Sequence, residues 1–187
     1  MYSCEVNGVK IDIPVSDGLF SPRHPDRGTL AMLSVSRFDP GDRCLDLGCG
    51  CGLVGIYLAL KLGQENVVLC DVDPLAVQAA RQNLAANHLD CPVYLSDALD
   101  GVPDRAFKLI LCNPPYQSDF AVAKKLIEKS FNRLEIGGTL MLVTKRRDWY
   151  LNKLKAIFGG AKIVEKDGYF VFSAWKLRPV YANRLDK

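Results

Sequence analysis

The residues of this sequence with the clearest chemical potential lie at 43–55, where an apolar run ends in Asp46 and passes into closely spaced glycines. Gly48, Gly50 and Gly52 allow a tight backbone turn and leave no side chain between the main chain and a ligand. The apolar residues that follow predict a helix, whose first N–H groups point outward without partners. A loop of this kind beside a carboxylate predicts a site for a nucleoside cofactor.

Two classes of cofactor compete for this loop. Residues 50–55 match the G-x-G-x-x-G pattern of dinucleotide-binding proteins, so an NAD or NADP oxidoreductase is one alternative. Asp46 argues against it, because a carboxylate repels a pyrophosphate. The same carboxylate suits the cationic amino-acid end of S-adenosylmethionine. Residues 46–52 also resemble the Asp-x-Gly-x-Gly-x-Gly pattern of class I methyltransferases, which use that cofactor.

Acidic side chains also follow the next two apolar runs. Asp71 comes roughly 20 residues after the glycines, the offset at which an acid binds the ribose hydroxyls of a nucleotide. We expect Asp97 to accept a hydrogen bond from the adenine amine, with Val72 and Ala98 on either side of the ring. The carboxyl ends of parallel strands meet at one edge of a sheet, so these acids predict a single cofactor site.

The run Asn113-Pro114-Pro115-Tyr116 follows a further apolar segment and indicates chemistry on an amine. Two prolines favour an extended backbone and remove two N–H donors, which leaves carbonyl groups free to face a ligand. The Asn113 side-chain oxygen and the Pro114 carbonyl can accept both hydrogens of a planar NH₂ group. Tyr116 offers a ring on which a base can stack. We expect these four residues to form the catalytic site.

The elements that position these residues alternate between strands and helices. We expect strands at 44–47, 67–70, 93–95, 107–112 and 139–144, a C-terminal hairpin at 162–165 and 169–175, and an N-terminal hairpin within 4–15. Helices are expected at 26–34, 53–62, 74–87, 120–134 and 148–158. The predicted fold is α/β and Rossmann-like, with seven mostly parallel strands, an antiparallel C-terminal hairpin and helices on both faces.

Length and composition favour a single domain. The 187 residues suit a single domain, in which 1–40 form a hairpin and helix, 41–176 the cofactor-binding core and 177–187 a basic tail. We expect a cytoplasmic protein, since we find neither a membrane-spanning apolar run nor a signal peptide. We expect no metal, because there are only two histidines and no C-x-x-C spacing among seven cysteines.

The net charge of +3 is too small to indicate a dedicated nucleic-acid-binding domain. The basic residues are nevertheless unevenly placed. Lys145, Arg146, Arg147 and the tail carry a concentrated share of them. This pattern fits either a face for a phosphate backbone or an ordinary solvated surface.

The motifs together resemble a known family. Residues 46–52 and 113–116 resemble class I methyltransferases that act on exocyclic or amide NH₂ nitrogens, and residues 17–21 and 26–33 narrow the likeness to the small methyltransferase domain family. That family includes ribosomal RNA guanine-N2 methyltransferases, and the likeness runs from about residue 5 to 176. It implies that Phe20, Gly28 and Thr29 lie beside the methionine end of the cofactor. The expected cofactor-binding residues are then Phe20, Gly28, Thr29, Asp46, Leu47, Gly48, Cys49, Gly50, Asp71, Val72, Asp97, Ala98 and Asn113.

We therefore expect an S-adenosylmethionine-dependent N-methyltransferase that acts on a nucleobase amine in RNA, with guanine N2 of ribosomal RNA favoured and S-adenosylhomocysteine as product. Two departures from the family leave alternatives open. The ribosomal enzymes carry a further N-terminal domain that helps to dock RNA and that these residues do not include, so a cofactor-binding module that needs a partner is one alternative. Their tetrapeptide usually ends in Phe, whereas Tyr116 ends this one, as in the glutamine methyltransferases of release factors and in adenine-N6 enzymes. The oligomeric state stays open.

Overall fold

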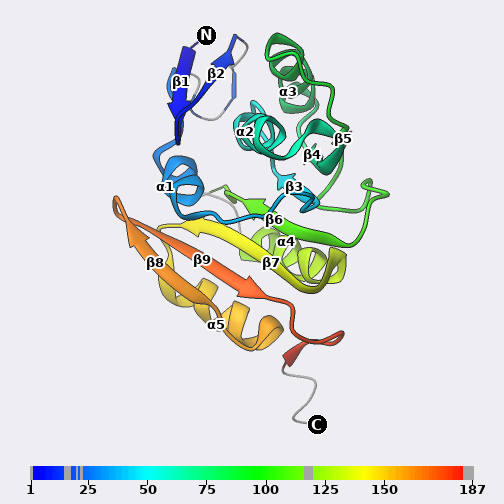
Figure 1. Cartoon of the computed structure of the whole chain (residues 1–187). Helices are drawn as coiled ribbons and strands as arrows, with labels where there is room; N and C mark the ends of the chain where they lie inside the picture. Colours follow the sequence, from blue (N-terminus) through cyan, green and yellow to red (C-terminus); the bar gives the residue numbers. More distant parts are fainter. Residues whose placement is uncertain (1, 15–17, 20, 22, 116–119, 183–187) are drawn as a thin grey trace.

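A computed structural model describes residues 2–14, 18–19, 21, 23–115 and 120–182 (Figure 1). Its strands are β1 (Tyr2–Val6), β2 (Val9–Ile13), β3 (Cys44–Leu47), β4 (Val67–Asp71), β5 (Val93–Leu95), β6 (Phe107–Cys112), β7 (Leu134–Thr144), β8 (Lys162–Lys166) and β9 (Tyr169–Trp175). Its helices are α1 (Arg27–Val35), α2 (Leu53–Leu62), the 3₁₀-helix η1 (Gln64–Asn66), α3 (Pro74–Ala86), α4 (Phe120–Arg133) and α5 (Arg147–Phe158).

The main sheet has seven strands in the order β5-β4-β3-β6-β7-β9-β8, and β1 and β2 form a separate hairpin. β3, β4, β5, β6 and β7 pair in parallel, whereas β9 is antiparallel to both β7 and β8. The predicted fold class is therefore confirmed. The chain runs outward from β3 to β5 and then returns to β6 on the other side of β3. This reversal opens a crevice at the carboxyl ends of β3 and β6, where open α/β sheets bind ligands.

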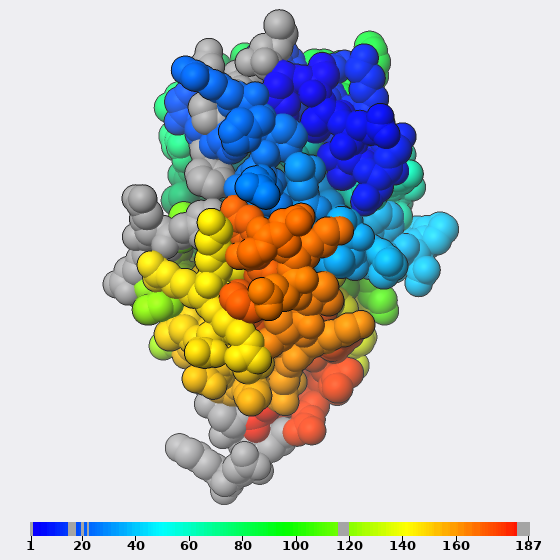
Figure 2. All heavy atoms as spheres, turned by 90° about the vertical axis from the view of Figure 1, so that its left-hand side faces the viewer, coloured from blue at the N-terminus to red at the C-terminus, as the bar shows by residue number. Residues whose placement is uncertain are grey.

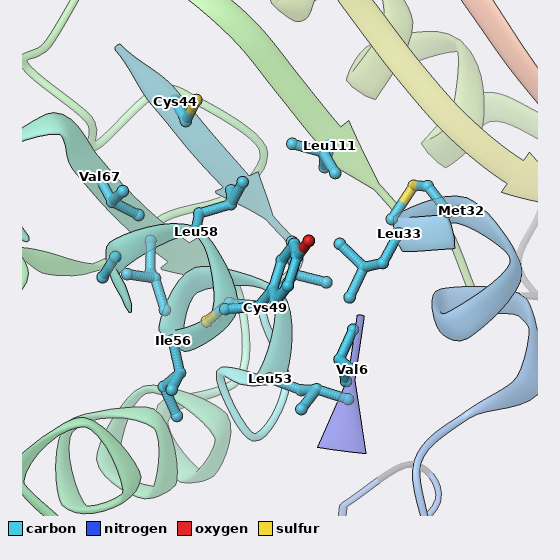
Figure 3. Packing of buried hydrophobic residues seen from close by; sticks show 14 of the residues in the cluster. Val6, Met32, Leu33, Cys44, Cys49, Leu53, Ile56, Leu58, Val67 and Leu111 are labelled. Atoms are coloured by element: carbon cyan, nitrogen blue, oxygen red, sulfur yellow. The ribbon is translucent and has the colours of Figure 1, made fainter. Parts of the chain in front are cut away.

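Helices cover both faces of the sheet, with α1, α2 and α3 on one side and α4 and α5 on the other (Figure 1). Side chains alternate between the faces along a strand. Leu109 and Leu111 of β6 accordingly join the first core, while Ile110 and Cys112 join the second. Figure 3 shows Val6 of β1 packed beside α2 in the first core. The N-terminal hairpin is thus built into the core that supports the crevice.

Two helices begin with the capping residues that the sequence supplies. The carboxylate of Asp26 accepts a hydrogen bond from Thr29 N at 2.7 Å, and α1 follows it. Asp73 caps α3 in the same way at Leu75 N, 2.9 Å away, with Pro74 in the first turn. Each cap satisfies an N–H that the helix itself leaves unpaired and contributes about 1 kcal/mol. The caps fix where both helices start relative to the strand ends.

The N-terminal hairpin begins at Tyr2, two residues before its expected start, and the largest error in an expected boundary is at β7. The strand predicted at 139–144 begins five residues earlier, at Leu134, so Gly137 and Gly138 lie inside β7. The register explains this, because Phe107 pairs with Leu134 while Leu109 pairs with Thr139, and the extra residues form a bulge. A Cβ atom on Gly138 would lie 2.8 Å from the Phe107 carbonyl oxygen. The glycine therefore permits close approach of two strands and does not end the helix.

Candidate functional site

A cavity of about 610 Å³ opens at the carboxyl ends of β3, β4, β5 and β6. Its size is within the range of small-molecule sites. Most of the expected site residues line it: Thr29, Asp46, Leu47, Gly48, Cys49, Gly50, Asp71, Val72, Asp97, Ala98, Asn113, Pro114 and Pro115. Gly28 is buried in α1 and is not among the lining residues. Phe20 and Tyr116 lie outside the described residues.

The glycine loop is held against the end of β4 by hydrogen bonds. Gly48 N and Cys49 N both donate to the Cys70 carbonyl oxygen, at 2.9 and 3.0 Å. Gly50 N donates to Asp71 Oδ2 at 2.9 Å. Gly48 and Gly50 have φ values of 74° and 53°, in the left-handed region that favours glycine. The loop thus presents a close, shaped backbone wall to the cavity.

Asp46 is almost completely buried at the end of β3. Its Oδ2 accepts a hydrogen bond from Gly55 N, in the first turn of α2, at 2.8 Å. The pKa of Asp46 is raised to about 7, mainly by burial and to a lesser degree by the charge of Asp71, while the bond from Gly55 opposes the rise. A carboxylate that is costly to ionise is stabilised by a positive charge nearby. The cavity is therefore suited to a cationic ligand group at this point.

Asp71 organises the loop and remains able to bind a ligand. Its Oδ1 accepts from Asp73 N at 3.0 Å, and its Oδ2 accepts from Gly50 N. An ionised carboxylate can accept about four hydrogen bonds. Two acceptor positions are therefore left for hydroxyl groups of a bound molecule, since the side chain also lines the cavity.

The third acid, Asp97, has a partner that the sequence pattern did not indicate. Its side chain is 70% exposed, and its Oδ2 lies 2.7 Å from Lys125 Nζ of α4. Val72 is exposed at the rim, whereas Ala98 is buried. Ala98 and Val72 both line the cavity, as an apolar clamp around a flat ring would require. Asp97 is thus an acceptor at the edge of the cavity with one oxygen already engaged by a lysine.

The side-chain amide of Asn113 is oriented by two acceptors from the N-terminal segment. Its Nδ2 donates to Asp26 Oδ2 at 2.8 Å and to Thr29 Oγ1 at 2.9 Å. A carboxylate has no hydrogen to give, so the NH₂ end of the amide must face Asp26. The Oδ1 atom is buried and has no hydrogen-bond partner among the described residues. An unpaired buried acceptor costs free energy that a ligand donor would recover.

Asp26 is the main residue of the site that the sequence analysis missed. The family pattern includes it, but we assigned it no role. One carboxylate oxygen serves both Thr29 N and Asn113 Nδ2, and so joins the start of α1 to the end of β6. The only local signal is its capping position, which many surface aspartates share. Tyr2 and Ser21 also line the cavity, and no pattern around them indicated it.

The described part of the chain contains no helix long and apolar enough to cross a membrane. Within the same residues, no group of three or more His, Cys, Asp or Glu side chains is placed to hold a metal ion. All seven cysteines are free.

Comparison with known proteins places this geometry in a family. The methyltransferase small domain matches residues 10–173. A ribosomal RNA small subunit methyltransferase C of Pseudomonas aeruginosa is 32% identical over 178 residues, covering 92% of this chain and 53% of that protein. A structure of a T. thermophilus 16S rRNA N2 methyltransferase in complex with AdoMet and guanosine superimposes with a TM-score of 0.84 at 26% identity, covering 94% of this chain and 50% of the other.

The chain spans about half the length of the curated relatives that it matches. The structure of a methyltransferase from Pyrococcus furiosus superimposes over 89% of this chain and 89% of its own, with a TM-score of 0.70. At 22% identity this likeness shows a shared fold. The family match extends from β2 to β9 and includes the glycine loop, the three acids and the residues after β6. The chain therefore belongs to the methyltransferase small domain family.

Proposed function

We propose that this chain is an S-adenosylmethionine-dependent N-methyltransferase that acts on a nucleobase amine in RNA, with guanine N2 of ribosomal RNA as the favoured target. The observation that carries the proposal is the Asn113 amide, whose NH₂ end is fixed by Asp26 and Thr29 beside the cavity. Its unpaired oxygen calls for a donor, and an exocyclic amine is one. The relatives named as ribosomal RNA methyltransferases support the same substrate class.

The cavity residues fit the cofactor in three regions. Asp46 would hold its cationic amino-acid end beside the backbone of the glycine loop, together with Phe20, Gly28 and Thr29. Asp71 would accept from the ribose hydroxyls, and Asp97, Val72 and Ala98 would contact the adenine. Three acids in one cavity oppose a dinucleotide, because a pyrophosphate brings negative charge to the same place. S-adenosylhomocysteine would then leave the same cavity as the product.

In this proposal the protein positions the amine and supplies no covalent intermediate. When bound, S-adenosylmethionine supplies the electrophilic methyl group. Asn113 Oδ1 and the Pro114 carbonyl oxygen accept the two amine hydrogens and so hold the nitrogen lone pair toward the cavity. Tyr116 stacks against the base. Such fixed placement of two reacting groups accounts for much of the rate enhancement in enzymes of this kind.

The proposal assigns different tasks to different parts of the chain. Residues 41–176 hold the cofactor, and residues 1–40 close the cavity through Asp26 and Thr29. The reaction would take place in the cytoplasm, on ribosomal RNA. A glutamine side chain of a protein also ends in a planar NH₂ group, which the same two acceptors could hold. The first experiment must therefore separate these two substrates.

That experiment has two stages. The purified chain is titrated calorimetrically with S-adenosylmethionine, NAD and NADP, and then incubated with methyl-labelled cofactor and either ribosomal RNA or a peptide release factor. We expect binding of S-adenosylmethionine alone and labelling of the RNA. Labelling of the release factor alone would overturn the RNA assignment. Binding of a nicotinamide cofactor in place of S-adenosylmethionine would overturn the whole proposal.

Replacing Asp71 by alanine is expected to weaken S-adenosylmethionine binding by about 10- to 100-fold, because hydrogen bonds to a charged group contribute about 1.5–3 kcal/mol. Calorimetry measures the change. Asp73→Ala is the matched control, since Asp73 is a neighbouring acid that caps α3 and is not among the cavity-lining residues. It should lower thermal stability and leave the dissociation constant unchanged. If Asp71→Ala binds as tightly as the original chain, Asp71 does not contact the ribose.

A further inference from the structure

The surface beside the site carries a layered stack of aromatic rings and cations. The rings of Phe120 and Trp149 are stacked, with centroids 4.4 Å apart and an interplanar angle of 19°. The guanidinium of Arg146 lies 5.0 Å from the Phe120 centroid, on one end of the stack. Lys153 Nζ lies 6.0 Å from the Trp149 centroid. Trp149 packs against the second core, whereas Phe120 is still 38% exposed, so the stack reaches from that core to the surface.

The strand register places the start of the basic run, from which Arg146 reaches the stack, close to Asn113. β6 and β7 are parallel neighbours, and Cys112 pairs with Leu142. Asn113 is therefore level with Val143, and Lys145 follows two residues later, directly after the end of β7. Neighbouring strands are about 4.8 Å apart and rise about 3.3 Å per residue, so the basic run begins within roughly 10 Å of the Asn113 backbone. Figure 2 shows this part of the chain, in yellow, on the molecular surface beside β8 and β9.

Two of the three cations in this run form no ion pair with the carboxylates that the structure describes. Lys145, Arg146 and Arg147 are all exposed. Arg147 pairs with Asp148, 3.1 Å away. Among the described residues, neither Lys145 nor Arg146 forms an ion pair with a carboxylate; Lys145 instead lies 4.9 Å from the Tyr169 ring centroid. A ring orients a cation without cancelling its charge, and leaves it able to bind an anion.

We propose that Lys145 and Arg146 bind the phosphates of the RNA strand that flanks the target nucleotide, while Phe120 and Trp149 hold the Arg146 guanidinium in place. This inference rests on the proposed function and names the surface that the RNA backbone crosses. A nucleotide whose base enters the cavity has a phosphate on each side, and the exposed basic run after β7 begins within roughly 10 Å of the Asn113 backbone. RNA carries one charge per nucleotide, which matches two adjacent cations that form no ion pair with a described carboxylate.

The test compares two double variants of equal charge. Lys145→Ala with Arg146→Ala removes the proposed phosphate contacts. Lys10→Ala with Lys61→Ala removes two exposed cations from β2 and α2, on the side of the sheet covered by α1–α3. Binding of a single-stranded ribosomal RNA fragment is measured between low and moderate salt, S-adenosylmethionine binding by calorimetry, and KM and kcat for RNA methylation. The melting temperature shows whether each variant folds.

We expect the Lys145 and Arg146 variant to bind RNA about tenfold more weakly, and the slope of log affinity against log salt to fall in magnitude by about 1.4, the value for two lost phosphate contacts on a single strand. KM for RNA should rise, while kcat and cofactor affinity stay unchanged. Equal RNA affinity and salt slope in the two double variants would overturn the inference and leave the proposed function standing.

Two further outcomes also decide the matter. A loss of melting temperature without a change in RNA affinity would mean that the stack only joins α4 to α5, and the inference falls. The other outcome is that the unsubstituted chain binds S-adenosylmethionine and methylates a protein, but neither binds nor methylates RNA. This result would overturn the proposed RNA substrate, and with it the phosphate contacts of Lys145 and Arg146.

Discussion

Replacing Asn113 by alanine should lower kcat for methyl transfer by about 10²- to 10³-fold, the size of the effect when one positioned polar group is removed from a reacting centre. S-adenosylmethionine affinity should change far less, because Asn113 is assigned to the amine. The NH₂ group of the Asn113 amide donates to both Asp26 and Thr29, which fixes the side chain. Its oxygen therefore needs no reorientation when the amine binds. Single-turnover methylation of RNA at saturating cofactor measures the loss.

Two further variants separate a positioning role from a structural one. Asn66→Ala removes an asparagine of η1 that bonds to the Leu62 carbonyl oxygen, away from the cavity lining, and should leave turnover unchanged. Asp26→Ala keeps Asn113 but removes one acceptor that orients its amide, so it should also lower turnover. It should in addition lower the free energy of unfolding by about 1 kcal/mol, because the cap of α1 is lost. Equal losses of turnover and cofactor affinity in Asn113→Ala would show that Asn113 only supports the strand end.

Much of this architecture could be predicted because local and global signals agree. Asp73 and Pro74 mark the start of α3, and the short apolar runs at 44–47, 93–95 and 107–112 became strands with those bounds. A polar residue lies at the end of each of these strands or follows it. The carboxyl ends of parallel strands meet at one edge of a sheet, so these residues were predicted to lie together, and in the structure they do. The fold and the position of the cavity therefore follow from the periodicity of apolar residues and from the residues that begin and end each element.

The contacts that could not be predicted join residues far apart in sequence. Asp26 and Asn113 are separated by 87 positions, and no pattern in either neighbourhood indicates that one will orient the other. The pairing of Lys125 with Asp97 depends on how α4 lies over the end of β5. Gly137 and Gly138 indicated the end of a helix, yet they serve a bulge between β6 and β7, which only the pairing register reveals. Side-chain partnerships of this kind depend on tertiary packing.

Replacing Asp46 by asparagine should strengthen the fold at alkaline pH and weaken cofactor binding at the same time. Burial raises the pKa of Asp46 from 3.8 to about 7, so the folded chain holds this proton more tightly than the unfolded chain does. The stability that this tighter proton binding gives the folded chain is therefore present in full below pH 3.8 and is lost as the pH rises through about 7. Asparagine keeps an oxygen for Gly55 N and never ionises, so its advantage in unfolding free energy should grow between pH 5 and pH 8 to a few kcal/mol at most, on the order of 1.4 per pKa unit.

Cofactor affinity should show the opposite effect, because the cationic end of S-adenosylmethionine needs the ionised form. In the original chain we expect the affinity to fall by up to about tenfold per pH unit below pH 7, as Asp46 takes up its proton. Asp46→Asn should bind the cofactor about 10- to 100-fold more weakly at pH 8 and show no such pH dependence, since no charge remains to titrate.

The control variant Asp90→Asn removes an exposed acid that does not line the cavity, and it should change neither stability nor cofactor affinity. Thermal melts and calorimetry at pH 5, 6, 7 and 8 measure both effects on the same samples. If Asp46→Asn binds the cofactor as tightly as the original chain, the cation lies elsewhere in the cavity; if its stability advantage does not grow with pH, Asp46 is already ionised without cost, and the buried carboxylate is stabilised by the glycine loop alone.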